Sequence, residues 1–291
     1  MTGEMMPDAI KNGMALRKYI QDDLRFDDFP FFFQVSFRFI LDLAIWIDPE
    51  AYKKLPIFEP VAYRDQKWKK LGFVRGQANP STALLVDDNS YVKNYMNGST
   101  KFISSKKISY YNDKQLVSGS GFVACHIWDE VGHGKAKATG NHKLFSFIPN
   151  IVWLPQDVAY LTDIPGSPIK DILKQLSVNL YHGEKMANTD LQLIVDTSWE
   201  KLLEIPHNQL IPIKAIPNRD EYNLMKGFDS AIKNKISRHK VFAEALIEHG
   251  TGRPISPHLI KKTYVETMHL ADPAKAHALG LWLEGYLNAL P

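Results

Sequence analysis

The 291-residue sequence predicts an α+β fold that is mainly helical and contains a small antiparallel β region. Two observations support this prediction. Apolar residues recur at helical spacing in residues 1–50 and again through most of the chain after residue 186. Between these parts, residues 90–128 alternate in polarity and are interrupted by the tight-turn signals "NGS", "YND" and "SGSG". We therefore divide the chain into a helical region 1–85, a core region 86–185 with antiparallel strands, and a helical region 186–291.

The most apolar stretch, residues 29–47, is predicted to be a buried helix rather than a membrane span. Gln34, Arg38 and Asp42 interrupt it at four-residue spacing, which places the three polar groups on one helical face. A charged residue at the centre of a bilayer costs about 2.5 kcal/mol or more. No membrane partner is therefore expected. The sequence "DPE" that follows indicates the end of this helix or the cap of a new one.

Composition and charge exclude some classes of protein. Lys and Arg number 35 against 32 Asp and Glu, and the formal net charge of +3 is too small for a histone-like binder, although local basic clusters could still contact phosphates. A single cysteine excludes an intramolecular disulfide framework and fits a reducing compartment. The first residues, "MTGEMMPDAIKNG", have neither the basic nor the apolar part of a signal peptide. We expect a cytoplasmic protein.

The later part of the core region predicts an order of strand, loop, strand and helix. Its segments are the strand "GFVACHIW", the glycine-rich basic loop "GHGKAKATGNHK", the strand "LFSFIPNIVWL" and the helix "PQDVAYLTD", with proline in its first turn.

The remaining sequence is predicted to be mostly helical. "SPIKDILKQLSVNLYHG" ends on a glycine suited to a helix C-terminus, and "TDLQLIVDTSWEKLLEIP" is a further short element. Two long amphipathic stretches begin at "DEYNLMKGFDS" and "DPAKAHALG", and the proline-rich "IPHNQLIPIKAIPNRD" is the best candidate for a linker. The basic run "KNKISRHK" at 233–240 is either a solvated helix face or a contact for a duplex backbone.

A strand that ends in His126, a second strand that carries Asn150 and a following helix form the layout of a one-metal phosphodiesterase site. Such chemistry needs an imidazole that takes a proton from the attacking water near neutral pH. It also needs a cation that stabilises charge on the phosphate and the leaving oxygen. An asparagine would orient the imidazole or pin the loop, because buried amides are normally hydrogen-bonded.

The segments "ACHIW", "FIPNIVWLP" and "LTD" resemble a divergent form of the HNH, or ββα-metal, nuclease motif over about residues 120–182. The resemblance implies that His126 is the general base and that Asn150 is the central asparagine. It also implies a metal ligand just before the base, here Cys125 where Asp or His is usual. Two further ligand positions one turn apart on the helix are Ala159 and Asp163, of which only Asp163 can bind a metal.

The resemblance implies a divalent metal cofactor with few protein ligands. Water, substrate phosphate or Asp157 would complete a shell that Asp163 and Cys125 begin. Mg²⁺ tolerates such a shell and is the first choice, and Mn²⁺ or Zn²⁺ is the alternative, since a thiolate suits zinc better. Each residue also has a structural alternative: His126 as a satisfied half-buried histidine, Cys125 as a small core residue, Asn150 as a turn residue and Asp163 as a helix cap.

The glycine-rich loop adds basic groups that suit phosphate contact. These candidate nucleic-acid-binding residues are Lys135, Lys137, His142 and Lys143. The alternative is an exposed hairpin loop with ordinary solubilising lysines.

Together these features predict a metal-dependent DNA endonuclease, such as a restriction or phage-defence enzyme. A restriction role would imply a homodimer, because cutting both strands symmetrically needs two sites. The alternative function is a non-catalytic module that binds nucleic acid or protein and keeps a degenerate HNH hairpin. Cys125 and Ala159 are what such a loss of ligands would leave.

Overall fold

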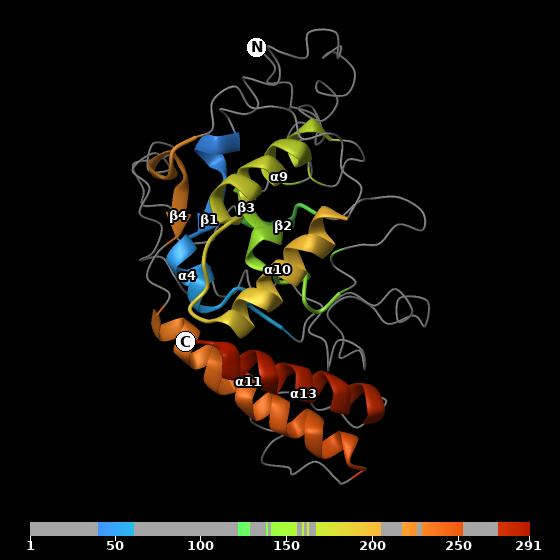
Figure 1. Ribbon diagram of the computed structural model, residues 1–291. Coiled ribbons are helices and arrows are strands. Elements are labelled where there is room, and N and C mark those ends of the chain that lie inside the picture. Colours follow the sequence, from blue (N-terminus) through green and yellow to red (C-terminus); the bar gives the residue numbers. More distant parts are fainter. Residues whose placement is uncertain are drawn as a thin grey trace, which may run out of the picture.

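The structure is a computed structural model and describes residues 40–60, 122–128, 138, 141–155, 159, 162, 167–204, 217–225, 229–252 and 273–291. Within these residues the protein is mostly helical with one small mixed sheet, so the α+β fold class is confirmed (Figure 1). None of the described helices combines the length and the hydropathy needed to cross a bilayer.

The sheet has four strands in the spatial order β2-β3-β1-β4. The strands are β1 (Ile45–Ile47), β2 (Phe122–His126), β3 (Ile151–Pro155) and β4 (Asn223–Met225). β3 pairs antiparallel with both β2 and β1, whereas β1 and β4 are parallel. The predicted antiparallel pair of the core region is thus present, but the strand predicted from Leu144 begins only at Ile151, because turns and a short 3-10 helix occupy residues 144–150. Each of the three regions predicted from the sequence contributes to this one sheet.

The helix predicted for residues 29–47 is wrong at its end, where residues 45–47 form the strand β1. Residues 40–43 are helical, but Ile45–Ile47 form a strand, and residues 29–39 lie outside the described part. All three strand residues are buried. A central strand buried on both faces has a continuous apolar sequence, which does not differ in pattern from a buried helix.

The "DPE" sequence after β1 caps a new helix, which is one of the two alternatives predicted for it. Asp48 is the N-cap of α4 (Pro49–Lys54), and its carboxylate accepts a hydrogen bond from the Glu50 N–H at 3.0 Å. Proline at the first helical position costs no hydrogen bond there. The carboxylate and the proline therefore fix the start of α4 directly after the sheet.

Four longer helices complete the described structure: α9 (Pro168–Tyr181), α10 (Thr189–Leu203), α11 (Asp229–Gly250) and α13 (Pro273–Ala289). Just after α9, Gly183 has a φ of 86°, which confirms the predicted glycine at the helix end. The helix predicted to begin at residue 220 begins later in the structure. Residues 223–225 form β4, and α11 begins at Asp229. α11 and α13 lie side by side in Figure 1.

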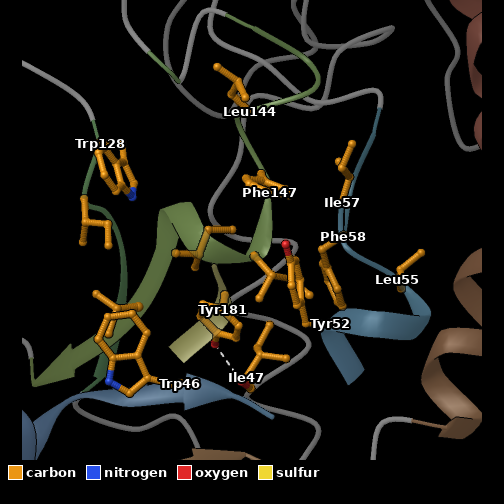
Figure 2. Close-up of a cluster of buried hydrophobic side chains, with 14 of the residues drawn as sticks. Trp46, Ile47, Tyr52, Leu55, Ile57, Phe58, Trp128, Leu144, Phe147 and Tyr181 are labelled. Carbon is orange, nitrogen blue, oxygen red and sulfur yellow. Dashed lines mark hydrogen bonds between the residues drawn. The ribbon is translucent and has the colours of Figure 1, made fainter. Parts of the chain in front are cut away.

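An aromatic cluster joins the sheet to the helices. The Tyr181 hydroxyl of α9 donates to the Ile47 carbonyl of β1 at 2.6 Å (Figure 2). The ring of Tyr52 lies 5.1 Å from Tyr181 and 5.9 Å from Phe147, measured between centroids. Trp199 of α10 donates from Nε1 to the Tyr52 hydroxyl at 3.1 Å. This cluster connects β1 and α4 to α9 and α10.

Candidate active site

His126 and Asn150 lie at the same end of the β2–β3 hairpin. His126 is the last residue of β2 and pairs with Ile151, the first residue of β3. Asn150 ends the short 3-10 helix η6 (Ile148–Asn150) directly before that strand. The Ile127 N–H donates to the Asn150 carbonyl at 3.1 Å, which extends the pairing one step beyond the strands.

The Asn150 side chain is completely buried and uses both of its polar ends. Its Oδ1 accepts from the Trp128 N–H at 3.0 Å, and its Nδ2 donates to the Leu144 carbonyl at 2.9 Å. The amide thus ties together the chain after β2 and the chain before η6. Of the two roles predicted for this asparagine, the contacts correspond to pinning the loop. The turn alternative also holds, because the Asn150 N–H donates to the Phe147 carbonyl at 2.7 Å.

A backbone carbonyl fixes the orientation of the His126 imidazole. Nε2 lies 2.9 Å from the Phe145 carbonyl oxygen, and the ring centroid lies 4.7 Å from that of Phe145. A carbonyl can only accept a hydrogen bond, so Nε2 carries a proton and the lone pair of the neutral ring is on Nδ1. Nδ1 is therefore the atom that can take up a proton. The side chain is buried, with 9% exposure, which corresponds to the alternative of a satisfied core histidine.

α9 also contacts the backbone that leads into β3. The Pro149 carbonyl accepts from the Ser177 hydroxyl of α9 at 2.6 Å and from Trp128 Nε1 at 3.2 Å. The Lys174 ammonium lies 5.7 Å from the centre of the Trp128 ring. No pattern in the sequence indicates these roles for Ser177 and Lys174, and only the place of Trp128 in "CHIW" could have indicated its contact with the hairpin.

Cys125 lies in the hydrophobic core and is 6% exposed. Its Sγ is 4.0 Å from the carbonyl oxygen of Ala159, which is helical and buried. These surroundings favour the predicted alternative of a small core residue, because the thiolate that binds metal is costly to bury among apolar groups.

Part of the predicted metal-ligand set lies outside the described residues. Asp157 and Asp163 lie outside the described residues. Within the described ranges, no group of three or more His, Cys, Asp or Glu side chains is arranged to hold a metal ion. The assignment of Asp163 and Cys125 to a metal therefore stays a prediction.

His142 and Lys143 pack against Trp282 of α13, whereas Lys135 and Lys137 lie outside the described residues. The Lys143 ammonium lies 5.2 Å from the centre of the Trp282 ring, and the His142 ring meets Trp282 edge-to-face at 4.6 Å. Burial, and then Lys143 and Lys201, lower the pKa of His142 to about 4. Burial and Lys201 also lower the pKa of Lys143. The cluster thus gathers two ammonium groups around a neutral imidazole and an aromatic ring.

The basic run 233–240 lies on α11 and divides into two kinds of position. Lys233 and Lys240 are exposed, as a solvated face predicts. Lys235 and His239 are instead buried and contact Glu59. The sequence did not reveal this second set.

No protein-family model, curated protein or solved structure gives a significant match to the chain.

Proposed function

We propose that the protein is a metal-dependent DNA endonuclease built on a ββα-metal core. The strongest support comes from the arrangement of His126 and Asn150 at the end of the β2–β3 hairpin. There the Phe145 carbonyl orients His126, and Asn150 ties Trp128 to Leu144 through its buried amide. A general base needs such a fixed orientation, because proton transfer depends on the geometry between the base and the attacking water.

In the proposed reaction, Nδ1 of His126 takes a proton from the water that attacks the phosphodiester phosphorus. The imidazolium that results keeps its Nε2–H bond to the Phe145 carbonyl, and the carbonyl dipole stabilises the new positive charge. The bond between phosphorus and the 3′ oxygen breaks on the opposite side, and the 3′ alkoxide takes a proton from water to become a hydroxyl. Because both ring nitrogens carry protons after the transfer, the imidazolium then returns one proton to solvent before the next turnover.

A divalent cation would stabilise the charge that develops on the phosphate and on the leaving oxygen. Asp163 is the proposed protein ligand, together with water and substrate phosphate, and Mg²⁺ is the proposed ion because it keeps several waters in protein sites. Cys125 fits this set poorly, because its thiol is 6% exposed within the core.

The cluster of His142, Lys143, Lys201 and Trp282 supports a polyanionic partner. Lys143 and Lys201 repel each other electrostatically, and within the described part of the chain the contact found for the Lys143 ammonium is the Trp282 ring rather than a carboxylate. A nucleic-acid phosphate near this pair would reduce the repulsion between the two ammonium groups and release bound counterions. We propose DNA as the nucleic acid and, for a restriction role, a homodimer as the active form.

A second candidate function is a binding module that has lost catalysis. The burial of Cys125 and the presence of Ala159 at one proposed ligand position favour it. Such a module would keep the basic cluster around Trp282 and would bind nucleic acid without cutting it.

Plasmid cleavage tests the endonuclease proposal. Supercoiled DNA is incubated with purified protein in Mg²⁺, Mn²⁺, Zn²⁺ or EDTA, beside the variants His126→Ala and His182→Ala. His182 is the control because its residue is exposed, its ring packs on Trp199, and it has no part in the proposed reaction. We expect metal-dependent cleavage that His126→Ala reduces by at least about 100-fold and His182→Ala preserves.

Circular dichroism of both variants establishes that they are folded. If no metal supports cleavage of plasmid or RNA by the folded wild-type protein, His126 is not a general base. Retained DNA binding in a gel-shift measurement would then identify the binding module.

A further inference from the structure

A buried carboxylate lies between two buried basic side chains, away from the proposed site. Glu59 is 5% exposed, Lys235 is 9% exposed and His239 is 2% exposed. The Lys235 ammonium forms an ion pair with Glu59 Oε1, and His239 Nε2 lies 2.9 Å from Glu59 Oε2. Removing one partner of a buried ion pair is strongly unfavourable, because the other charge then remains without compensation. The cluster therefore anchors Glu59 firmly to α11.

The backbone around Glu59 is bound to the loop that carries the Phe145 carbonyl. The Glu59 N–H donates to the Ser146 hydroxyl at 2.6 Å, and the Phe58 N–H donates to the Ser146 carbonyl at 2.9 Å. One step further, Ile57 and Phe147 form an antiparallel β-bridge. Residues 56–59 thus run along the loop as a strap, with Ser146 as the point of closest attachment.

Ser146 and the carbonyl that holds His126 belong to the same peptide unit. The Phe145 carbonyl and the Ser146 nitrogen lie in one plane, because the peptide bond between them does not rotate freely. A shift of Ser146 therefore turns the carbonyl oxygen that lies 2.9 Å from His126 Nε2. The contacts of Ser146 with Phe58 and Glu59 oppose such a shift.

We propose that Glu59 and Ser146 are positioning residues for His126: the paired carboxylate fixes the strap 56–59 on α11, and Ser146 transmits this restraint to the Phe145 carbonyl. The consequence for catalysis rests on the proposed endonuclease function. The consequence for the imidazole does not, since the orientation of the ring can be measured without a substrate.

NMR of the full-length protein labelled with ¹⁵N-histidine tests the proposal. A hydrogen-bonded Nε2–H proton exchanges slowly with water and gives a resolved signal, which the His126→Ala variant assigns by its disappearance. The variants compared are Ser146→Ala and Glu59→Gln. The matched control is Ser177→Ala, which removes an equally buried serine hydroxyl whose 2.6 Å bond goes to the Pro149 carbonyl on the α9 side.

We expect Ser146→Ala and Glu59→Gln to broaden or abolish the His126 Nε2–H signal, and Ser177→Ala to retain it. With DNA cleavage as a second measurement, kcat should fall about tenfold in Ser146→Ala while KM stays unchanged, since only the orientation of the base is affected. If Glu59→Gln does not fold, Ser146→Ala decides alone.

Two results would overturn the proposal. One is a His126 signal in Ser146→Ala that matches the wild type, and the other is an equal loss of the signal in Ser146→Ala and Ser177→Ala, which would indicate general loosening of the hairpin. A wild-type protein that cuts no DNA while Ser146→Ala still alters the His126 signal would overturn the endonuclease function and support the positioning role.

Discussion

The hairpin loop at residues 141–150 and the helix pair α11–α13 are held in place by different kinds of interaction. In the loop, the carbonyls of Leu144, Phe145 and Ser146 accept hydrogen bonds in succession from Asn150, His126 and Phe58. In the helix pair, glycines allow close approach instead: a Cβ added at Gly280 would lie 2.8 Å from Ile247 Cγ1.

This difference teaches where each region tolerates substitution. A hydrogen-bonded loop depends on the chemistry of a few polar atoms, because a buried donor or acceptor that loses its partner keeps the full cost of desolvation. A close-packed helix pair depends on volume, because packed side chains cannot easily move aside. Deletion of polar atoms should therefore harm the loop, and addition of atoms should harm the helices.

The largest effect is expected for Asn150→Ala. The change removes the acceptor of the buried Trp128 N–H and one of two donors to the Leu144 carbonyl, which keeps the Phe147 N–H at 3.3 Å. The free energy of unfolding should therefore fall by about 3 kcal/mol. Urea unfolding measures it. Asn179→Ala is the comparison, since Asn179 is only partly buried and should cost less. A loss in Asn150→Ala no greater than that in Asn179→Ala would contradict this account of the loop.

Gly280→Ala should cause the next largest loss of stability, because it disturbs the packing of α13 against α11. The added methyl group would also lie 3.0 Å from the Ile247 nitrogen and from Leu246 Cβ, and overpacking of this kind costs about 2 kcal/mol. Gly285→Ala on the same helix is the control, because its Cβ would meet nothing within 4 Å. That variant should be more stable than the wild type by up to about 1 kcal/mol in thermal unfolding. Equal destabilisation by both variants would argue against close packing at Gly280.

His142 gives the contact between loop and helix pair a dependence on pH. Its pKa of about 4 in the folded protein lies below the ordinary value of 6.5, so the unfolded chain takes up a proton first as the pH falls. The stabilisation is fully present above pH 6.5 and is lost as the pH falls to about 4. It should amount to about 2 kcal/mol at most, because the ring keeps some exposure to solvent.

His142→Phe keeps an aromatic ring against Trp282 and removes this titration. Unfolding free energies of both proteins between pH 4 and 7 should therefore diverge in slope, with the flatter profile in the variant. Parallel profiles would show that His142 does not titrate abnormally.

The smallest effect is expected for Asn188→Ala at the start of α10. Asn188 accepts from the Leu191 N–H at 2.9 Å and donates to the Ala289 carbonyl of α13 at 2.7 Å, but it is exposed. Loss of such a helix cap costs about 1 kcal/mol. Asn188→Asp keeps the acceptor and should recover most of the loss in a thermal unfolding measurement. A failure to recover would assign the effect to the bond with Ala289.

Local signals in the sequence were enough to predict the parts of the fold whose partners are close in the chain. The antiparallel pairing around His126 and Asn150, the end of α9 at Gly183 and the helix α13 all follow from alternation, glycine placement or helical spacing. β1 and β4 did not, because three-residue strands carry too short a pattern. Ile45 becomes part of a strand through pairing with Trp153 and Asn223, which lie far away in the sequence.

The candidate site divides in the same way. Side chains with a chemical signature, such as His126 and Asn150, could be predicted to lie together, and the hairpin register places them at one end. The groups that hold them could not be predicted, because any residue can supply the carbonyl that Phe145 offers. The burial of Lys235 and His239 could not be predicted for another reason. The run "KNKISRHK" has the pattern of a solvated helix face, and the partner of both residues, Glu59, lies 180 positions before His239 in the sequence.

The parallel pairing of β1 with β4 also affects the rate at which the protein folds. Ile45 and Asn223 are separated by more than half of the chain, and the Asn223 amide closes onto the Asp42 carbonyl at 2.8 Å. Contacts between such distant residues slow folding, since the intervening chain must be ordered before they form. On a ribosome, β1 would have to wait for most of the polypeptide to be synthesised. The protein is therefore expected to fold late and slowly, with a long interval in which β1 is open to chaperones.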